Sequence, residues 1–164
     1  MHTAKPQTVY LGIGSNQGDR QALLEQAVAL IAQHVGSVRA CSTFIETAPW
    51  GFISDHLFLN GVVCVDTTLS PHALLRTTQR IERLLGRQHK TGRQGYADRP
   101  IDIDILLYGD RIIHTRRLTV PHPHMLQRDF VLQPLLEIAP DITMPTTHQR
   151  IADAATEEKN TADT

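Results

Sequence analysis

Two aspartates, Asp102 and Asp104, have the spacing in this 164-residue chain that most directly suggests chemistry. They alternate with apolar residues in a segment that reads as a half-buried strand from Pro100 to Tyr108. Residues two apart on a strand point to the same face, roughly 6–7 Å from each other. Two such carboxylates repel each other unless a cation lies between them, and Mg²⁺ is the usual cation at oxygen ligands. The pair therefore predicts either a site for two Mg²⁺ ions that act on phosphate or a solvated polar strand face.

Basic residues surround this strand in the sequence. Arginine forms bidentate contacts with phosphate, and basic residues beside an acidic pair suit a metal-bound polyphosphate. Taken singly, most of these residues are ordinary surface groups, so only their nearness to the acidic strand favours a phosphate site. They are Arg87, His89, Lys90, Arg93 and Arg99 before the strand, and Arg116, Arg117, His122 and Arg128 after it.

Phe58 and Asn60 lie on one face of another expected strand. An aromatic ring beside an amide can stack on a flat heterocycle and bond to its polar edge, although such residues also occur as half-buried strand residues. The segment Gly12-Ile13-Gly14 lacks the third glycine of a dinucleotide fingerprint, since Gln17 occupies that position. Its glycines are instead expected to let the chain turn from strand to helix.

Caps and periodicity predict the elements that must position these residues. Asp19 caps a helix that runs to about His34, and Ser70 caps a second helix that begins at Pro71. The Gly109-Asp110 pair predicts a hairpin turn from the acidic strand into the next one. The strands are expected at residues 8–13, 38–46, 58–66, 100–108, 111–114 and 118–121.

This order of elements predicts an α+β, ferredoxin-like sandwich: a mainly antiparallel sheet with helices packed on its faces. Residues 38–46 are expected to pair antiparallel with 58–66, with the two helices on one face and the polar working groups on the other. We expect a single domain over residues 1–145. The tail, 146–164, has few large apolar groups and is expected to be frayed or disordered.

The composition bounds the class of protein. Apolar residues make up 41% and charged residues 20%, which is ordinary for a soluble globular domain. A net charge of −1 argues against broad binding to nucleic acid or to an anionic membrane, and no apolar run is long enough to span a bilayer. The two cysteines, Cys41 and Cys64, are expected to be buried free thiols in a reducing cytoplasm.

From about Val9 to Pro140 the chain resembles the 6-hydroxymethyl-7,8-dihydropterin pyrophosphokinases of folate biosynthesis. The most specific match is Arg99-Pro100-Ile101-Asp102-Ile103-Asp104-Ile105-Leu106. Further matches, in the same order as in the family, are Gly12-Ile13-Gly14-Ser15-Asn16, Thr47-Ala48-Pro49-Trp50-Gly51, Phe58-Leu59-Asn60, Gln79-Arg80-Ile81-Glu82, Arg117-Leu118-Thr119-Val120-Pro121-His122, Arg128-Asp129-Phe130 and Glu137-Ile138-Ala139-Pro140.

The resemblance implies transfer of the β,γ-diphosphate of ATP to the pterin hydroxymethyl group, with release of AMP. Asp102 and Asp104 would hold two Mg²⁺ ions, and together with Arg87 and Arg99 they are the expected catalytic groups. His122 and Arg128 would help to neutralise the phosphates. The nucleotide contacts implied are Gln79, Glu82, His89, Arg117 and Thr119, and the pterin contacts are Thr47, Pro49, Trp50, Phe58, Asn60 and Phe130.

The sequence also departs from the family. The loop before Arg99 is longer than usual and lacks a common tryptophan, with Gln94 and Tyr96 the nearest candidates to replace it. His89 and Pro123 replace a common arginine and tyrosine. We expect a cytoplasmic monomer that binds ATP and dihydropterin. The alternatives are another Mg²⁺-dependent phosphoryl or nucleotidyl transferase, and a module that binds these ligands without turnover.

Overall fold

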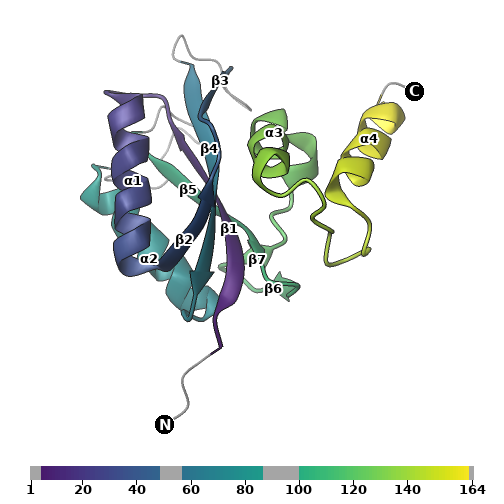
Figure 1. Cartoon of the computed structure of the whole chain (residues 1–164), viewed down its shortest axis with the longest axis horizontal. Helices are drawn as coiled ribbons and strands as arrows, with labels where there is room; N and C mark the ends of the chain where they lie inside the picture. Colours follow the sequence, from purple (N-terminus) through teal and green to yellow (C-terminus); the bar gives the residue numbers. More distant parts are fainter. Residues whose placement is uncertain (1–4, 49–56, 87–99, 163–164) are drawn as a thin grey trace.

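The computed structural model describes residues 5–48, 57–86 and 100–162, with side chains described as far as residue 157. In this part of the chain a five-stranded sheet carries helices on both faces, and a two-stranded sheet lies beside it (Figure 1). The strands are β1 (Gln7–Ser15), β2 (Gly36–Cys41), β3 (Ile45–Thr47), β4 (Phe58–Thr67), β5 (Asp102–Tyr108), β6 (Ile113–His114) and β7 (Thr119–Val120). The helices are α1 (Arg20–His34), α2 (Pro71–Leu84), the 3-10 helix η1 (Met125–Gln127), α3 (Asp129–Ile138) and α4 (Ile151–Ala162).

The two expected helices begin where their capping residues predict. The Asp19 carboxylate accepts a hydrogen bond from the backbone N–H of Ala22 (3.1 Å), which satisfies a donor that the first turn of α1 leaves unpaired. Ser70 does the same for Ala73 at the start of α2 (3.3 Å), with Pro71 as the first helical residue. Both helix predictions are confirmed.

The main sheet is antiparallel, with β1 at its centre. The strand order is β2-β4-β1-β5, and β3 pairs with β4 on the same side as β2. The predicted pairing of 38–46 with 58–66 is confirmed, since Val38 lies opposite Val65 and Ile45 opposite Asn60. This arrangement confirms the α+β, ferredoxin-like fold class.

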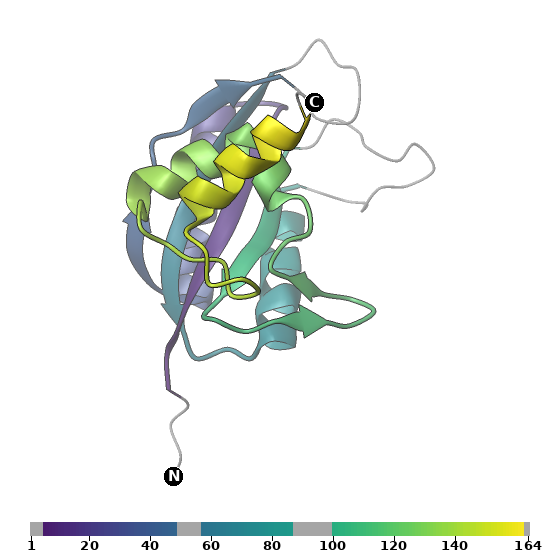
Figure 2. The same cartoon turned by 90° about the vertical axis from the view of Figure 1, so that its right-hand side faces the viewer.

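Helices cover both faces of the sheet. α1 and α2 pack on one face, where Leu11, Ile31 and Leu74 are fully buried. α3 packs on the other face, over Val62 and Leu106, and η1 and α4 pack against α3 in the same core (Figure 2). The expectation that the two helices lie on one face is confirmed, whereas the other face is not entirely the expected polar working face, because it bears apolar residues where α3 covers it.

The expected strand 38–46 is divided between β2 and β3 by residues 42–44. Ser42 keeps this break attached to β4: its N–H donates to the Val62 carbonyl, and its hydroxyl accepts from the Val62 N–H (both 2.9 Å). The next residue, Thr43, donates through its backbone N–H and its hydroxyl to the carboxylate of Glu137 on α3. At this break, one backbone hydrogen bond and several side-chain hydrogen bonds therefore hold the chain in place of regular strand pairing.

The predicted hairpin at Gly109-Asp110 is half correct. The turn forms, with Gly109 at φ +53° and the Arg111 N–H donating to the Tyr108 carbonyl (3.0 Å). The chain then leaves the main sheet, and β6 pairs with β7 instead of β5, with Ile113 opposite Val120. This pairing differs from the predicted one because the turn residues define only the turn itself, whereas the partner of β6 is β7, a strand that follows it in the chain.

Part of the expected tail is ordered and packed. Residues 151–162 form α4, and Ile151, Ala154 and Ala155 are buried. Ile151 packs in the same core as Met125 of η1 and Leu135 of α3. The small alanines let α4 lie close to that core, so few large apolar residues suffice to hold it. Within the described residues, no helix combines the length and the apolar character needed to cross a membrane.

The cysteine prediction holds for one of the two residues. Cys64, on β4, is buried, whereas Cys41, on the edge strand β2, is exposed; both are free thiols. Desolvation of the sulfur is the main cause that raises the pKa of each thiol; for the exposed Cys41 this desolvation is only partial.

Candidate functional site

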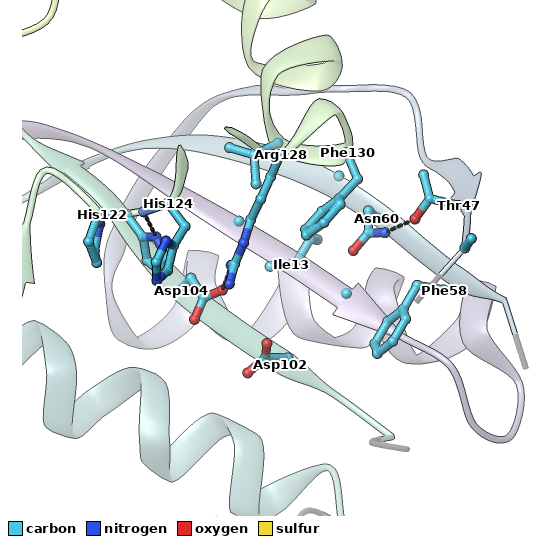
Figure 3. A pocket seen from close by; sticks show the side chains of 16 residues that line it. Ile13, Thr47, Phe58, Asn60, Asp102, Asp104, His122, His124, Arg128 and Phe130 are labelled. Atoms are coloured by element: carbon cyan, nitrogen blue, oxygen red, sulfur yellow. Dashed lines mark hydrogen bonds and ion pairs between the residues drawn. The ribbon is translucent and has the colours of Figure 1, made fainter. Parts of the chain in front are cut away.

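The two aspartates occupy one face of β5, as their alternation predicts. Asp102 and Asp104 are half-buried, whereas Ile103 and Ile105 between and after them are buried. The carboxylates lie where β5 begins (Figure 3). Both aspartates line two adjacent pockets, so ligands in either pocket have access to the same carboxylates.

Glycines in β1 lie between the polar residues of β4 and those of β5 that line the first pocket. Gly14 lies opposite Asn60 of β4 on one side and opposite Asp102 of β5 on the other. A Cβ atom on Gly14 would stand 2.5 Å from Oδ1 of Asn60, so a side chain there requires the Asn60 amide to move. The expectation that these glycines turn the chain into a helix is wrong, because β1 continues to Ser15 and the turn has Gly18 at φ +69°. Their absent side chains leave the floor of the first pocket open.

The first pocket, of about 330 Å³, has an aromatic end. Phe58 and Phe130 lie at that end near Asn60 (Figure 3). Thr47 lies opposite Phe58 in the β3–β4 pair, and its hydroxyl accepts a hydrogen bond from the Asn60 side-chain amide (2.7 Å). This bond orients the amide, so the end of the pocket suits a flat ring with a polar edge.

Arg128 connects the aromatic end with the carboxylates. Its side chain is only 11% exposed, and Nη1 lies 3.9 Å from Oδ2 of Asp104. Its guanidinium carbon lies 5.6 Å from the centroid of the Phe130 ring. The residue immediately precedes α3, so the same turn of chain supplies a cation and an aromatic ring to one pocket.

His122 is held at the outer edge of β5 by its own backbone, whose N–H donates to the Leu106 carbonyl (3.0 Å). Burial, with the nearby charges of Arg128 and His124, lowers the pKa of His122 from the ordinary 6.5 to about 4, and Asp102 opposes this shift. The ring is therefore neutral at pH 7. Its Nδ1 accepts from the His124 N–H (3.3 Å), which leaves Nε2–H as a donor.

The second pocket, of about 280 Å³, lies along the outer edge of β5 between α2 and β7. Its lining includes four of the expected nucleotide contacts: Gln79, Glu82, Arg117 and Thr119. Glu82 also has a structural role, because its Oε2 accepts from the Ile103 N–H (2.9 Å) and its side chain is buried. Among the described residues no further strand pairs with this edge of β5, so the carboxylate satisfies a donor that the described sheet does not.

The described residues of the predicted site thus fall into two groups that meet at Asp102, Asp104 and His122. The first pocket gathers Thr47, Phe58, Asn60, Arg128 and Phe130, and the second gathers Gln79, Glu82, Arg117 and Thr119. The other predicted site residues, Pro49, Trp50, Arg87, His89 and Arg99, lie outside the described residues, as do Gln94 and Tyr96. Their roles stay predictions.

The carboxylates of Asp102 and Asp104, where the two pockets meet, suit a hard cation that is bound by the protein and by a ligand together. The parts of the chain that the structure describes contain no group of three or more His, Cys, Asp and Glu side chains that could enclose a metal ion. Two carboxylates supply only part of the octahedral shell of Mg²⁺, so phosphate oxygens and water have to complete it. The pair fits a metal that arrives with a polyphosphate.

His124 and Gly14 are among the lining residues that the sequence analysis did not assign to the site. His124 lines the first pocket, with its ring centroid 6.2 Å from that of His122. Gly14 forms the pocket floor. His124 stands two residues after His122 in the sequence, which was the available signal, whereas the importance of Gly14 depends on strand register and has no local signal.

Comparison with known proteins finds consistent relatives. Residues 10–140 match the family described as 7,8-dihydro-6-hydroxymethylpterin-pyrophosphokinase (HPPK). A 2-amino-4-hydroxy-6-hydroxymethyldihydropteridine pyrophosphokinase of Porphyromonas gingivalis is 50% identical over 133 residues, covering 80% of this chain and 90% of that protein. One of Bacillus subtilis is 44% identical over 134 residues, covering 81% and 78%.

Solved structures share the fold. A crystal structure of wild-type HPPK-DHPS from Plasmodium falciparum superposes with a TM-score of 0.75 at 17% identity over 96% of this chain. An HPPK-DHPS in complex with substrates gives 0.74 at 16% identity, also over 96%. The chain spans less than half the length of these two proteins, 46% and 44%. At such low identity the likeness concerns the fold alone.

Proposed function

The chain belongs to the 7,8-dihydro-6-hydroxymethylpterin-pyrophosphokinase family, and from this premise we propose that it transfers the β,γ-diphosphate of ATP to the hydroxymethyl group of 6-hydroxymethyl-7,8-dihydropterin. The products are AMP and the pterin diphosphate. The observation that carries the proposal is that two pockets of different character meet at Asp102 and Asp104. A reaction between two substrates requires such a meeting point, and transferable phosphate requires charge compensation there.

The aromatic pocket is the proposed site of the pterin. Phe58 and Phe130 stack on the ring, and Asn60 bonds to its amide edge while Thr47 holds the Asn60 amide in place. With the ring at this end, the hydroxymethyl group extends toward Arg128 and Asp104, which lie 3.9 Å apart. The acceptor oxygen is thereby oriented toward the phosphates.

The pocket along β5 is the proposed site of the nucleotide. Gln79, Arg117 and Thr119 contact it, and Glu82 contributes chiefly by holding α2 against β5 at Ile103. The triphosphate then runs from this pocket to the aspartates. His122, which lines both pockets, donates a hydrogen bond from Nε2 to phosphate.

Asp102 and Asp104 are the proposed holders of two Mg²⁺ ions, which, when bound, offset phosphate charge and polarise the reacting oxygens. The chain's own residues do the rest by position and charge: Arg128 compensates negative charge as the α–β phosphate bond breaks, and the aromatic rings exclude water from the acceptor. The proposal needs no covalent intermediate on a protein side chain.

A product assay tests the proposal. The protein is incubated with ATP, Mg²⁺ and 6-hydroxymethyl-7,8-dihydropterin, and AMP is separated from ADP. We expect AMP that depends on both the pterin and Mg²⁺, lost in Asp104→Asn and retained in Asp110→Asn, a matched change of an exposed aspartate. ADP or released pyrophosphate would indicate another transferase, and pterin binding without turnover would indicate a binding module. The predicted monomeric state and cytoplasmic location stay predictions.

A further inference from the structure

The guanidinium group of Arg20, the first residue of α1, contacts both β3 and the residue that precedes β4. Its Nη1 donates to the backbone carbonyl of Leu57 (2.8 Å), and its Nη2 lies 3.1 Å from Oε2 of Glu46. Glu46 is the middle residue of β3, and Leu57 immediately precedes β4. One side chain of α1 therefore contacts the chain on both sides of the connection between β3 and β4.

Both contacts are adjacent to residues that line the aromatic pocket. Glu46 precedes Thr47, and Leu57 precedes Phe58. Thr47 and Phe58 lie opposite each other in the β3–β4 pair, and both line the first pocket. Arg20 lines neither of the two pockets, so any effect that it has on a ligand there passes through these neighbours.

Among the described residues, the pocket wall at Thr47 is supported by the pairing of β3 with β4 and by contacts of β3 with α3. β3 has three residues, and β4 is the strand with which it pairs among the described residues. A strand this short, at the edge of a sheet, forms few backbone hydrogen bonds and frays readily at its end. Thr47 is the last residue of β3, and it orients Asn60 through the 2.7 Å hydrogen bond. A shift of β3 would therefore also turn the Asn60 amide.

We propose that Arg20 is a positioning residue that sets the width and the hydrogen-bonding pattern of the aromatic pocket by fixing Thr47 and Phe58 relative to each other. The identity of the ligand as a pterin rests on the proposed function, whereas the effect on the pocket does not. Arginine is suited to this task because two separate nitrogens reach two acceptors in a fixed plane, which the single ammonium of lysine does not reproduce.

The contacts of Arg20 contribute little to overall stability, so a substitution tests position more than folding. The side chains of Arg20 and Glu46 are 30% and 51% exposed, and exposed ion pairs contribute little. The chain offers a matched control in Arg39 on β2, whose Nη1 lies 3.5 Å from Asp66 near the other end of β4. Its side chain is also exposed, and neither residue lines a described pocket.

The test measures binding and structure in Arg20→Gln, Arg20→Lys and Arg39→Gln. Calorimetry gives the Kd of α,β-methylene-ATP with Mg²⁺, and then the Kd of 6-hydroxymethyl-7,8-dihydropterin in its presence. We expect Arg20→Gln to weaken pterin binding about tenfold, the order that one lost hydrogen-bonded contact produces. Nucleotide binding should stay within about twofold because the nucleotide pocket lies on the far side of the carboxylates. Arg20→Lys should fall between, and Arg39→Gln should match the wild type.

A second readout needs no ligand. The side-chain amide resonances of Asn60 should shift, and the backbone amides of β3 should exchange faster, in Arg20→Gln but not in Arg39→Gln. Wild-type binding of pterin in Arg20→Gln, or equal losses in both variants, would overturn the positioning role. If the wild type binds no pterin while the Asn60 resonances still shift in Arg20→Gln, the proposed function fails and the role of Arg20 stands.

Discussion

Replacing His122 with glutamine is expected to remove a pH dependence from the stability of this protein. Burial lowers the pKa of the folded imidazole to about 4, whereas the unfolded chain binds the proton near the ordinary 6.5. Between these values the unfolded state binds more protons than the folded state, so the free energy of unfolding falls as the pH falls. The loss is complete below the folded pKa, where the imidazole is protonated in both states.

The size of this effect follows from the two pKa values. Between pH 7 and pH 5, the difference in proton binding at this one residue lowers the free energy of unfolding by about 1.8 kcal/mol. A folded pKa one unit higher would still give about 1.5 kcal/mol, because most of the proton uptake in this range occurs in the unfolded state. The effect is a substantial part of the stability of a typical domain.

Urea denaturation followed by circular dichroism at pH 7, 6 and 5 measures this difference. The wild type should lose about 1.8 kcal/mol more than His122→Gln between pH 7 and pH 5. His114→Gln, which replaces an exposed histidine on β6, should follow the wild type. Equal losses in the wild type and His122→Gln would refute the inference that the folded protein holds this imidazole neutral.

Three further substitutions test the site and its supports. Asp102→Asn should lower turnover by about 10²-fold or more with an unchanged circular dichroism spectrum, because it removes charge where phosphate is bound; near wild-type turnover would contradict the metal assignment. Gly14→Ala should weaken pterin binding while the protein stays folded, because the new Cβ would stand 2.5 Å from Asn60 Oδ1 and displace that amide; unchanged calorimetric affinity would show that the pocket floor adapts. Glu82→Ala should lower the free energy of unfolding by about 1–3 kcal/mol, since it leaves the Ile103 N–H without this acceptor. The control Glu25→Ala, on the exposed face of α1, should change the free energy of unfolding little. Equal effects of the two substitutions in urea denaturation would count against the stabilising role of the buried hydrogen bond.

Features that depend on near neighbours in the chain are predictable from the sequence. The Asp19 and Ser70 caps act on residues three positions away, so the starts of α1 and α2 follow from local signals. The alternation of Asp102 and Asp104 with isoleucines depends on the period of a single strand, and it assigns both carboxylates to one face of β5. The family resemblance adds the grouping of distant residues, which local patterns do not contain.

Features that depend on contacts between distant segments required the tertiary structure. β6 pairs with β7 and not with β5, and the strand break at residues 42–44 lies where Glu137, far along the chain, binds Thr43. The role of Gly14 follows from register, since only the pairing of three strands brings Asn60 and Asp102 to either side of it.

Glu82 has one feature that the sequence predicts and another that only the tertiary structure shows. The sequence places it on the second helix, and its resemblance to a family motif assigns it to the nucleotide. Its hydrogen bond to Ile103 arises only once α2 packs against the outer edge of β5. The sequence alone therefore determined the starts of α1 and α2, the shared strand face of the aspartates and the expected chemical character of the site. The tertiary structure decided which groups face one another, because hydrogen bonds and close packing between segments far apart in the chain have no periodic signal in the sequence.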